Sequence, residues 1–155
     1  MNRTERYVKR FYTAIGIVSP SQLNIKEIAA ILCLDVRYWE YSSEVARYKN
    51  RYKMFINEKQ NEMKQWQDFG HEMYHYCHDH VSYDLLHESY SAYGESKADY
   101  FAYHFCVPTF MLLQFKEVSI DVIANKFNVE YDFALRRFEM HNNKLMDRRV
   151  KHAVR

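Results

Sequence analysis

The sequence predicts an α+β fold that is mostly helical and contains one small β-sheet. Only three glycines and two prolines occur among the 155 residues, so we expect short loops and many helices. Apolar residues recur at helical spacing through most of the chain, whereas the side chains of residues 51–60 alternate as those of a strand do. The length suits one domain with a real core, and we expect residues 1–155 to form that single domain.

Two helices are expected before the first strand. The first should run from Thr4 to Ile15 and end near Gly16. The second should begin after Asn24, a favourable N-cap, with Glu27 at the position of a capping-box acid. Apolar residues then follow at helical spacing: Ile25, Ile28, Ala29 and Leu32.

This capped helix belongs to a unit that recurs later in the chain. Residues 24–40 and 119–141 each combine an N-cap, a short apolar helix and a turn at an apolar residue, Leu34 or Val129. Each unit resembles the front half of a helix-turn-helix, so DNA recognition is one interpretation. The other interpretation is a compact cover for the core. We favour the second, because neither unit offers an obvious row of base-reading side chains.

The best strand candidate is the stretch 51–60. Tyr52, Met54 and Ile56 should face one side of a sheet, and a short strand near residues 35–42 is the expected partner. We also expect an exposed edge on this stretch that could hold an extended peptide by strand addition.

Two longer helices should follow the strand. An apolar stripe at helical spacing predicts a buried helix over residues 61–77. The stripe consists of Met63, Trp66, Gly70, Met73 and Cys77. After a loop containing residues 78–89, another helix should cover residues 92–106 and stop before Pro108.

The helix over residues 61–77 carries the motif H-E-x-x-H, formed by His71, Glu72 and His75. Positions i and i+4 lie one turn apart on the same face, so the two histidines can bind one metal ion together. Glu72 points about 100° away by helical geometry. From there it can reach a water on the metal without being a ligand.

A catalytic zinc site needs a third protein ligand and keeps its fourth position for water. The candidates are His78, His80, Asp84, His87, Glu88 and Glu95. Glu95 begins the stretch "ESKAD", which places Asp99 one helical turn later. Such a pair can supply one metal-binding carboxylate and a second that accepts a hydrogen bond from a ligand histidine.

H-E-x-x-H followed by E-x-x-x-D, with Glu95 twenty positions after His75, resembles the gluzincin metallopeptidase pattern. The stretch "ESKADYFAYHFCVP" further resembles the ImmA/IrrE family of small bacterial and phage metallopeptidases. The matching positions are Glu95, Ala98, Asp99, Phe101, Ala102 and Pro108. Two positions depart from the family's usual pattern: Tyr74, where the family often has Gly, and Gly70, where it usually has Ala.

The resemblance implies a minimal zincin-like fold in which the small sheet packs on the H-E-x-x-H helix. It implies one zinc ion per chain, bound by His71, His75 and Glu95, with Asp99 supporting a ligand and Glu72 as general base. Members of the family in phages and mobile elements typically cleave a helix-turn-helix repressor. We therefore expect a zinc-dependent endopeptidase with such a repressor as its substrate.

Two other functions remain open. The chain could be a DNA-binding regulator with a vestigial zinc site, or a protein-binding module that kept the fold without cleaving anything. A protein dedicated to DNA binding usually has a stronger excess of basic residues than the formal net charge of +2 found here. DNA binding is therefore the less expected of these two functions. The further histidines, His78, His80, His87 and His104, receive no role from their spacing, and neither does an oxyanion-stabilising group.

The composition also bears on location. The start of the chain is charged and has no apolar segment of a signal peptide, and the apolar stretch 101–115 is too short to span a bilayer. Cys33, Cys77 and Cys106 are odd in number and form no C-x-x-C pair, which is typical of reduced thiols. We expect a cytoplasmic protein that does not contact a membrane.

Overall fold

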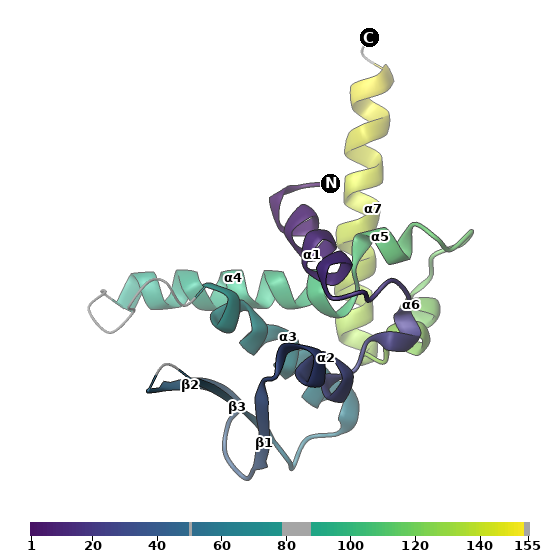
Figure 1. The fold of residues 1–155 in the computed structure, drawn as a ribbon. Coiled ribbons are helices and arrows are strands. Elements are labelled where there is room, and N and C mark those ends of the chain that lie inside the picture. Colours follow the sequence, from purple (N-terminus) through teal and green to yellow (C-terminus); the bar gives the residue numbers. More distant parts are fainter. Residues whose placement is uncertain (50, 79–87, 154–155) are drawn as a thin grey trace.

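The computed structural model describes residues 1–49, 51–78 and 88–153, and Figure 1 traces them from one end to the other. The elements are α1 (Arg3–Ala14), the short 3₁₀ helix η1 (Pro20–Gln22), α2 (Ile25–Leu32), β1 (Asp35–Trp39), β2 (Glu44–Tyr48), β3 (Arg51–Asn57), α3 (Glu62–His78), α4 (Glu88–Cys106), α5 (Thr109–Leu112), α6 (Ile120–Phe127) and α7 (Tyr131–Ala153). Helices predominate in the described part of the chain, and its strands form one sheet. The predicted α+β fold is confirmed.

The sheet has the strand order β1-β3-β2, so β3 is its central strand. β3 pairs with β1, as expected for the stretches 51–60 and 35–42, and this pairing is parallel, whereas β3 and β2 pair in antiparallel. The prediction of an exposed edge on residues 51–60 is wrong, because both edges of β3 are hydrogen-bonded to neighbouring strands. The edge beside α3 belongs instead to β2, a strand that the sequence did not predict.

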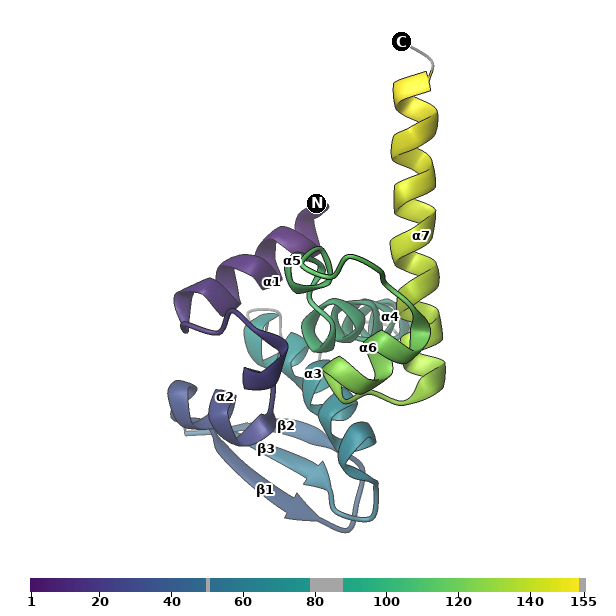
Figure 2. The ribbon, with the colours of Figure 1, turned by 90° about the vertical axis from the view of Figure 1, so that its right-hand side faces the viewer.

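The sheet packs against the helix that carries His71 and His75. Met54 and Ile56 on β3 are fully buried, whereas Lys53, the residue just before Met54, is exposed. This alternation follows from the two-residue period of a strand. Figure 2 shows the sheet as a layer with α2 and α3 over the same face. The small sheet therefore packs against α3, which is the arrangement that the family resemblance implies.

Helices α3 and α4 approach each other closely at Gly70. A Cβ atom added to Gly70 would lie 2.6 Å from the Sγ of Cys106, and that thiol donates to the carbonyl of Trp66 at 3.5 Å. Real Cβ atoms do not approach other atoms so closely, and interiors are packed too densely to yield easily. The thiol of Cys106 thus accounts for a glycine at a position where the ImmA/IrrE pattern usually has alanine.

A buried polar cluster joins α1, α5 and α7. The Glu5 carboxylate accepts hydrogen bonds from Thr109 Oγ1 at 2.9 Å and from the ammonium of Lys144, and Arg137 Nη2 donates to Thr109 Oγ1 at 2.9 Å. Burial raises the pKa of Glu5, but the hydrogen bonds from Lys144, the backbone of Asn2 and Thr109 outweigh it and lower that pKa to about 2. The cluster is therefore charged at neutral pH and ties the first helix to the last.

The first helix-turn unit is a helix followed by a strand. Asn24 caps α2 by accepting from the backbone N–H of Glu27 at 2.8 Å, as predicted. After Leu32 the chain turns at Cys33, which has a φ of 52°, and continues as β1. Residues 35–39, for which the sequence left both a second helix and a strand open, form the strand.

The second unit contains two helices. Ser119 caps α6, and the turn at Asn128, with a φ of 51°, leads into α7. α7 continues to Ala153, twelve residues beyond the end of the predicted unit at 141, and Figures 1 and 2 show its C-terminal half extending away from the other elements. Within the residues that are described, no helix combines the length and the apolar character needed to cross a bilayer.

Candidate metal centre

Helices α3 and α4 bring His71, His75 and Glu95 together. His71 and His75 lie one turn apart on α3, and Glu95 reaches them from α4. The Nε2 of His71 lies 3.4 Å from the Nε2 of His75 and 3.1 Å from the Oε2 of Glu95. The other carboxylate oxygen, Oε1, lies 3.5 Å from the Nε2 of His75. The structure thus unites the three residues that the sequence predicted as metal ligands.

The spacing and chemistry of these atoms fit a zinc ion. One donor atom from each residue lies within 4.8 Å of the other two. Ligand bonds of about 2.0–2.2 Å at a tetrahedral angle separate neighbouring donors by about 3.3–3.6 Å, and the observed separations of 3.1–3.5 Å are close to that. Two imidazoles and one carboxylate are also a ligand set that zinc enzymes use, with one position left open. Among the described residues, no second cluster of this kind is present.

Asp99 holds the ring of His71 from the side opposite to this cluster. Its Oδ1 lies 2.8 Å from the Nδ1 of His71, one helical turn after Glu95 on α4. A carboxylate at this nitrogen favours the tautomer with the proton on Nδ1, which leaves the lone pair of Nε2 directed at the cluster. The contact is the one that the E-x-x-x-D spacing predicted.

Glu72 lies beside the cluster but is not part of it. Its side chain is buried, with the residue only 8% exposed, and its Oε2 accepts the backbone N–H of Val45 at 2.9 Å. Burial raises the pKa of Glu72 to about 7, although the charge of His71 and the hydrogen bond from Val45 lower it in part. A carboxyl group with a pKa near neutrality is well matched to taking up and releasing a proton.

The start of β2 is fastened to α3 one turn before Glu72. Ser43 Oγ donates to Asp68 Oδ2 at 3.0 Å and accepts the backbone N–H of Asn57 at 3.0 Å. Lys64 forms an ion pair with the other oxygen of Asp68 at 2.8 Å. These contacts fix the chain entering β2, so that the N–H of Val45 meets the Glu72 carboxylate.

The remaining histidines of the motif region lie apart from the three-residue cluster or outside the described residues. His78 stacks on Tyr74 with ring centroids 4.4 Å apart, and its Nδ1 lies 2.8 Å from the carbonyl oxygen of the same tyrosine. Tyr74 also contacts Phe101, with centroids 5.7 Å apart, which gives this departure from the family pattern a packing role. His80, Asp84 and His87 lie outside the described residues.

Glu88, a ligand candidate, and His104, which received no role from its spacing, both lie apart from the three-residue cluster. Glu88 begins α4, so its backbone is helical and not part of a loop. His104 is buried on the part of α4 that faces α1 and α7, where burial and the charge of Arg137 lower its pKa to about 3. Its neighbours include Glu5, so His104 belongs to the interior near the polar cluster and not to the metal centre.

Sequence reasoning missed the contribution of β2. The N–H of Val45 is the backbone group that holds Glu72, and no side-chain motif marks such a contact. A weak signal existed in the alternation of "EVARY", but glutamate and alanine are both depleted in strands.

Comparison with known proteins agrees with the geometry. Residues 34–139 match the model of the IrrE N-terminal-like domain, the Peptidase_M78 family, and this range contains α3, α4, the three residues of the cluster and Glu72. The chain is 34% identical over 145 residues to the phage-like element PBSX protein XkdA of Bacillus subtilis, covering 90% of this chain and 73% of that protein. It is 27% identical over 146 residues to the uncharacterized protein YqaB of the same organism, covering 91% and 85%.

The family model spans more than half of the chain, and the aligned part of XkdA covers more than two thirds of either protein. A peptidase family of this kind implies a metal and a protein substrate, and the two histidines and one glutamate of the cluster are compatible with that metal. The sequence motif, the geometry of α3 and α4 and both comparisons agree, and the chain belongs to the IrrE N-terminal-like family of metallopeptidases.

Proposed function

We propose that the chain is a zinc-dependent endopeptidase whose site consists of His71, His75, Glu95 and Glu72. The observation that carries this proposal is the position of Glu72, next in sequence to one candidate ligand yet outside the ligand cluster and buried against β2. A site that only stabilised the fold would be closed by a fourth protein ligand and would have no use for an acid there.

His71, His75 and Glu95 would hold one zinc ion, with Asp99 fixing the tautomer and orientation of His71. When bound, zinc lowers the pKa of a water molecule and polarises a carbonyl group. Such chemistry requires that water and substrate reach the metal. The side chain of Glu95 is 56% exposed, so the cluster is accessible from the side of this residue.

Glu72 would move the proton. The N–H of Val45 holds Oε2, and within the described residues Oε1 has no hydrogen-bond partner, so Oε1 is the atom available to accept a proton from the attacking water. The same atom would then deliver that proton to the leaving amine nitrogen of the cut peptide bond. Burial of Glu72 assists the second step, because a carboxyl group with a pKa of about 7 holds the proton long enough to transfer it.

The substrate would lie extended along the outer edge of β2. β2 is an edge strand, and its Val45 N–H points away from β3 toward Glu72. Strand addition at this edge would give a peptide backbone hydrogen bonds and would place one of its carbonyl groups beside Glu72 and the three ligands. This edge replaces the one on residues 51–60 that the sequence had suggested.

We further propose that the substrate is a helix-turn-helix repressor of a phage or mobile element. Two findings support this choice: the resemblance to the ImmA/IrrE family and the relative XkdA, which is described as a protein of a phage-like element. A repressor encoded beside the gene for this chain is the specific candidate.

Co-expression with that neighbouring repressor tests the proposal. The wild-type chain should shorten the repressor at one position, whereas Glu72→Gln should leave it whole while keeping the fold and zinc. General base catalysis contributes about 10²–10⁴-fold, so the loss of cleavage should be nearly complete on gels or by mass spectrometry. If both proteins relieve repression equally and the repressor stays intact, the chain acts by binding and the peptidase proposal fails.

A further inference from the structure

A cavity of about 250 Å³ opens beside His71, between α3, α4 and the start of α7. Ligand sites for drug-sized molecules measure about 300–1,000 Å³, so a cavity of this size suits one side chain. It lies toward the start of α3 and toward the end of α4. The described residues that line it include Lys64, Asp68 and His71 from α3, Asp99 and Tyr103 from α4, and Phe133 from α7.

A cation and an anion face this cavity from different helices. Lys64 on α3 forms an ion pair with Asp68 at 2.8 Å, and its side chain is 40% exposed. Asp99 on α4 uses its Oδ1 to hold the Nδ1 of His71 at 2.8 Å, and its side chain is 67% exposed. A ligand in the cavity can therefore reach the ammonium hydrogens of Lys64 and the second carboxylate oxygen, Oδ2, of Asp99.

The cavity adjoins the β2 edge along which the substrate is proposed to lie. Ser43, two residues before Val45 on β2, donates to Asp68 at 3.0 Å, and Asp68 lines the cavity. Val45 bonds to Glu72, one helical turn after Asp68. In an extended peptide on this edge, the residues opposite Ser43 and Val45 are two positions apart, so their side chains share a face. The side chain opposite Ser43 would point toward Asp68 and enter the cavity.

The charges on the wall disfavour a charged substrate side chain. An aspartate or glutamate in the cavity would meet the carboxylates of Asp68 and Asp99, and a lysine or arginine would meet the ammonium of Lys64. A large apolar side chain would take these ions out of water without replacing their hydrogen bonds.

The side-chain amide of asparagine or glutamine fits both walls. It is uncharged, and its N–H₂ donor and carbonyl acceptor are separate atoms. It can therefore donate to Asp99 Oδ2 and accept from Lys64 at the same time, whereas the hydroxyl of serine or threonine must make both contacts through one oxygen atom.

We propose that this cavity is a specificity subsite for an asparagine or glutamine side chain of the substrate, selected by Lys64 and Asp99. The selected residue lies two positions from the substrate residue opposite Val45, and thus within three residues of the cut bond. This subsite rests on the proposed function, because it requires a peptide on the β2 edge.

The repressor cleaved in the co-expression test serves as the probe. Once its cut is mapped by mass spectrometry, each Asn or Gln within three residues of the cut is changed in turn to glutamate, lysine and leucine. At one of these positions every change should lower kcat/KM for the wild-type enzyme about 10- to 100-fold, as expected when hydrogen bonds to charged groups are lost.

Lys64→Met tests the enzyme's side of the contact. The variant keeps the length of the side chain but removes its charge and its donors, so the ammonium no longer offsets Asp68 and Asp99. A lysine at the selected substrate position should then be cut better than the natural amide, which reverses the order found for the wild type. If Lys64 served only the structure, its loss would lower the rates for all substrates alike.

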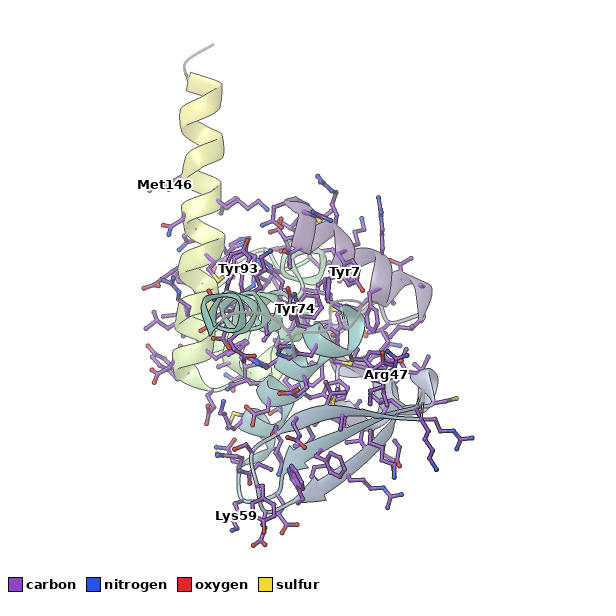
Figure 3. The ribbon with its side chains drawn as sticks, turned by 90° about the vertical axis from the view of Figure 1, so that its left-hand side faces the viewer. Tyr7, Arg47, Lys59, Tyr74, Tyr93 and Met146 are labelled. Atoms are coloured by element: carbon purple, nitrogen blue, oxygen red, sulfur yellow. The ribbon has the colours of Figure 1, made fainter. Side chains whose placement is uncertain are left out.

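Lys59→Met is the matched control. It removes an exposed cation that pairs with Glu40 at 3.5 Å, and Figure 3 shows this side chain at the outer end of the sheet. It should rank the substrates as the wild type does. A cut without an amide in the window, equal cleavage of the amide, glutamate and lysine forms by the wild type, or an unchanged ranking in Lys64→Met overturns the subsite alone. A repressor that the wild type never cuts overturns the proposed function and the subsite with it.

Discussion

Replacing Glu72 with glutamine should stabilise the metal-free protein at neutral and alkaline pH. Burial raises the pKa of Glu72 from 4.5 to about 7 in the folded chain, so the folded state binds the proton more tightly than the unfolded state does. The stability of the wild type therefore falls as pH rises from about 4.5 through about 7, because the folded state must then hold a buried negative charge. A glutamine has no charge to bury and keeps an oxygen that can accept the N–H of Val45.

The size of the effect follows from the difference between 4.5 and about 7. Each pKa unit corresponds to about 1.4 kcal/mol, so the two proteins should differ by about 3–4 kcal/mol in free energy of unfolding at pH 8. Below pH 4, where Glu72 is protonated in both states, the difference should nearly vanish. Such a cost is expected where a residue is placed for chemistry and not for stability.

Urea unfolding with a metal chelator present, at several pH values between 4 and 8, measures this difference. Glu117→Gln, which changes an exposed carboxylate, is the control and should follow the wild type at every pH. A Glu72→Gln protein that is less stable than the wild type at pH 8, or offset from it by the same amount at every pH, would refute the argument from burial.

Three further predictions concern the metal centre and the packing of α3 on α4. His75→Ala should reduce the zinc content of the purified protein from about one ion per chain to near zero by atomic emission, and full retention of zinc would show that the ligand assignment is wrong. Asp99→Ala should weaken zinc affinity about 10- to 100-fold in a chelator competition without altering the circular dichroism spectrum; an equal affinity would mean that this carboxylate does not orient His71. Gly70→Ala should lower the melting temperature, because crowding against Cys106 Sγ at 2.6 Å costs about 1–3 kcal/mol, more than the gain in helix propensity of about 1 kcal/mol. Combining it with Cys106→Ala should recover most of the loss, and a single variant as stable as the wild type would indicate a looser contact between the helices.

The helices were predictable from the sequence because their signals are local. Caps such as Asn24 and apolar residues at helical spacing act within a few turns, and they gave α1, α2, α3 and most of α4. The stripe also had one misplaced member, since Met63 at the start of α3 is 38% exposed. Periodicity cannot detect that the first turn of a helix projects beyond its neighbours.

The order of the strands was not predictable, because it depends on contacts distant in sequence. β3 reads as an isolated half-buried strand whether it lies at the edge or in the centre. β2 is specified by Ser43 bonding to Asp68 and by Val45 bonding to Glu72, each more than twenty residues away. With β2 in this place, the edge strand beside α3 is β2 and not β3. The proposed position of the substrate therefore lies along β2.

The candidate site was only partly predictable for the same reason. The i,i+4 rule places His71 and His75 together without any knowledge of the fold. The third ligand depends on how α4 packs on α3, so spacing alone left several carboxylates and histidines as candidates. Glu95 stood out through its spacing to Asp99 and the family resemblance, and both residues lie at His71 in the structure.

The most direct measurement of the central claim uses purified components. Wild type and Glu72→Gln, each shown by atomic emission to carry the same amount of zinc, are incubated with the purified neighbouring repressor, and the products are weighed by mass spectrometry. The site described here predicts two fragments from wild type whose masses sum to the repressor plus one water, and intact repressor from Glu72→Gln. Equal cleavage by both proteins at equal zinc would contradict the assignment of Glu72 as the group that moves the proton.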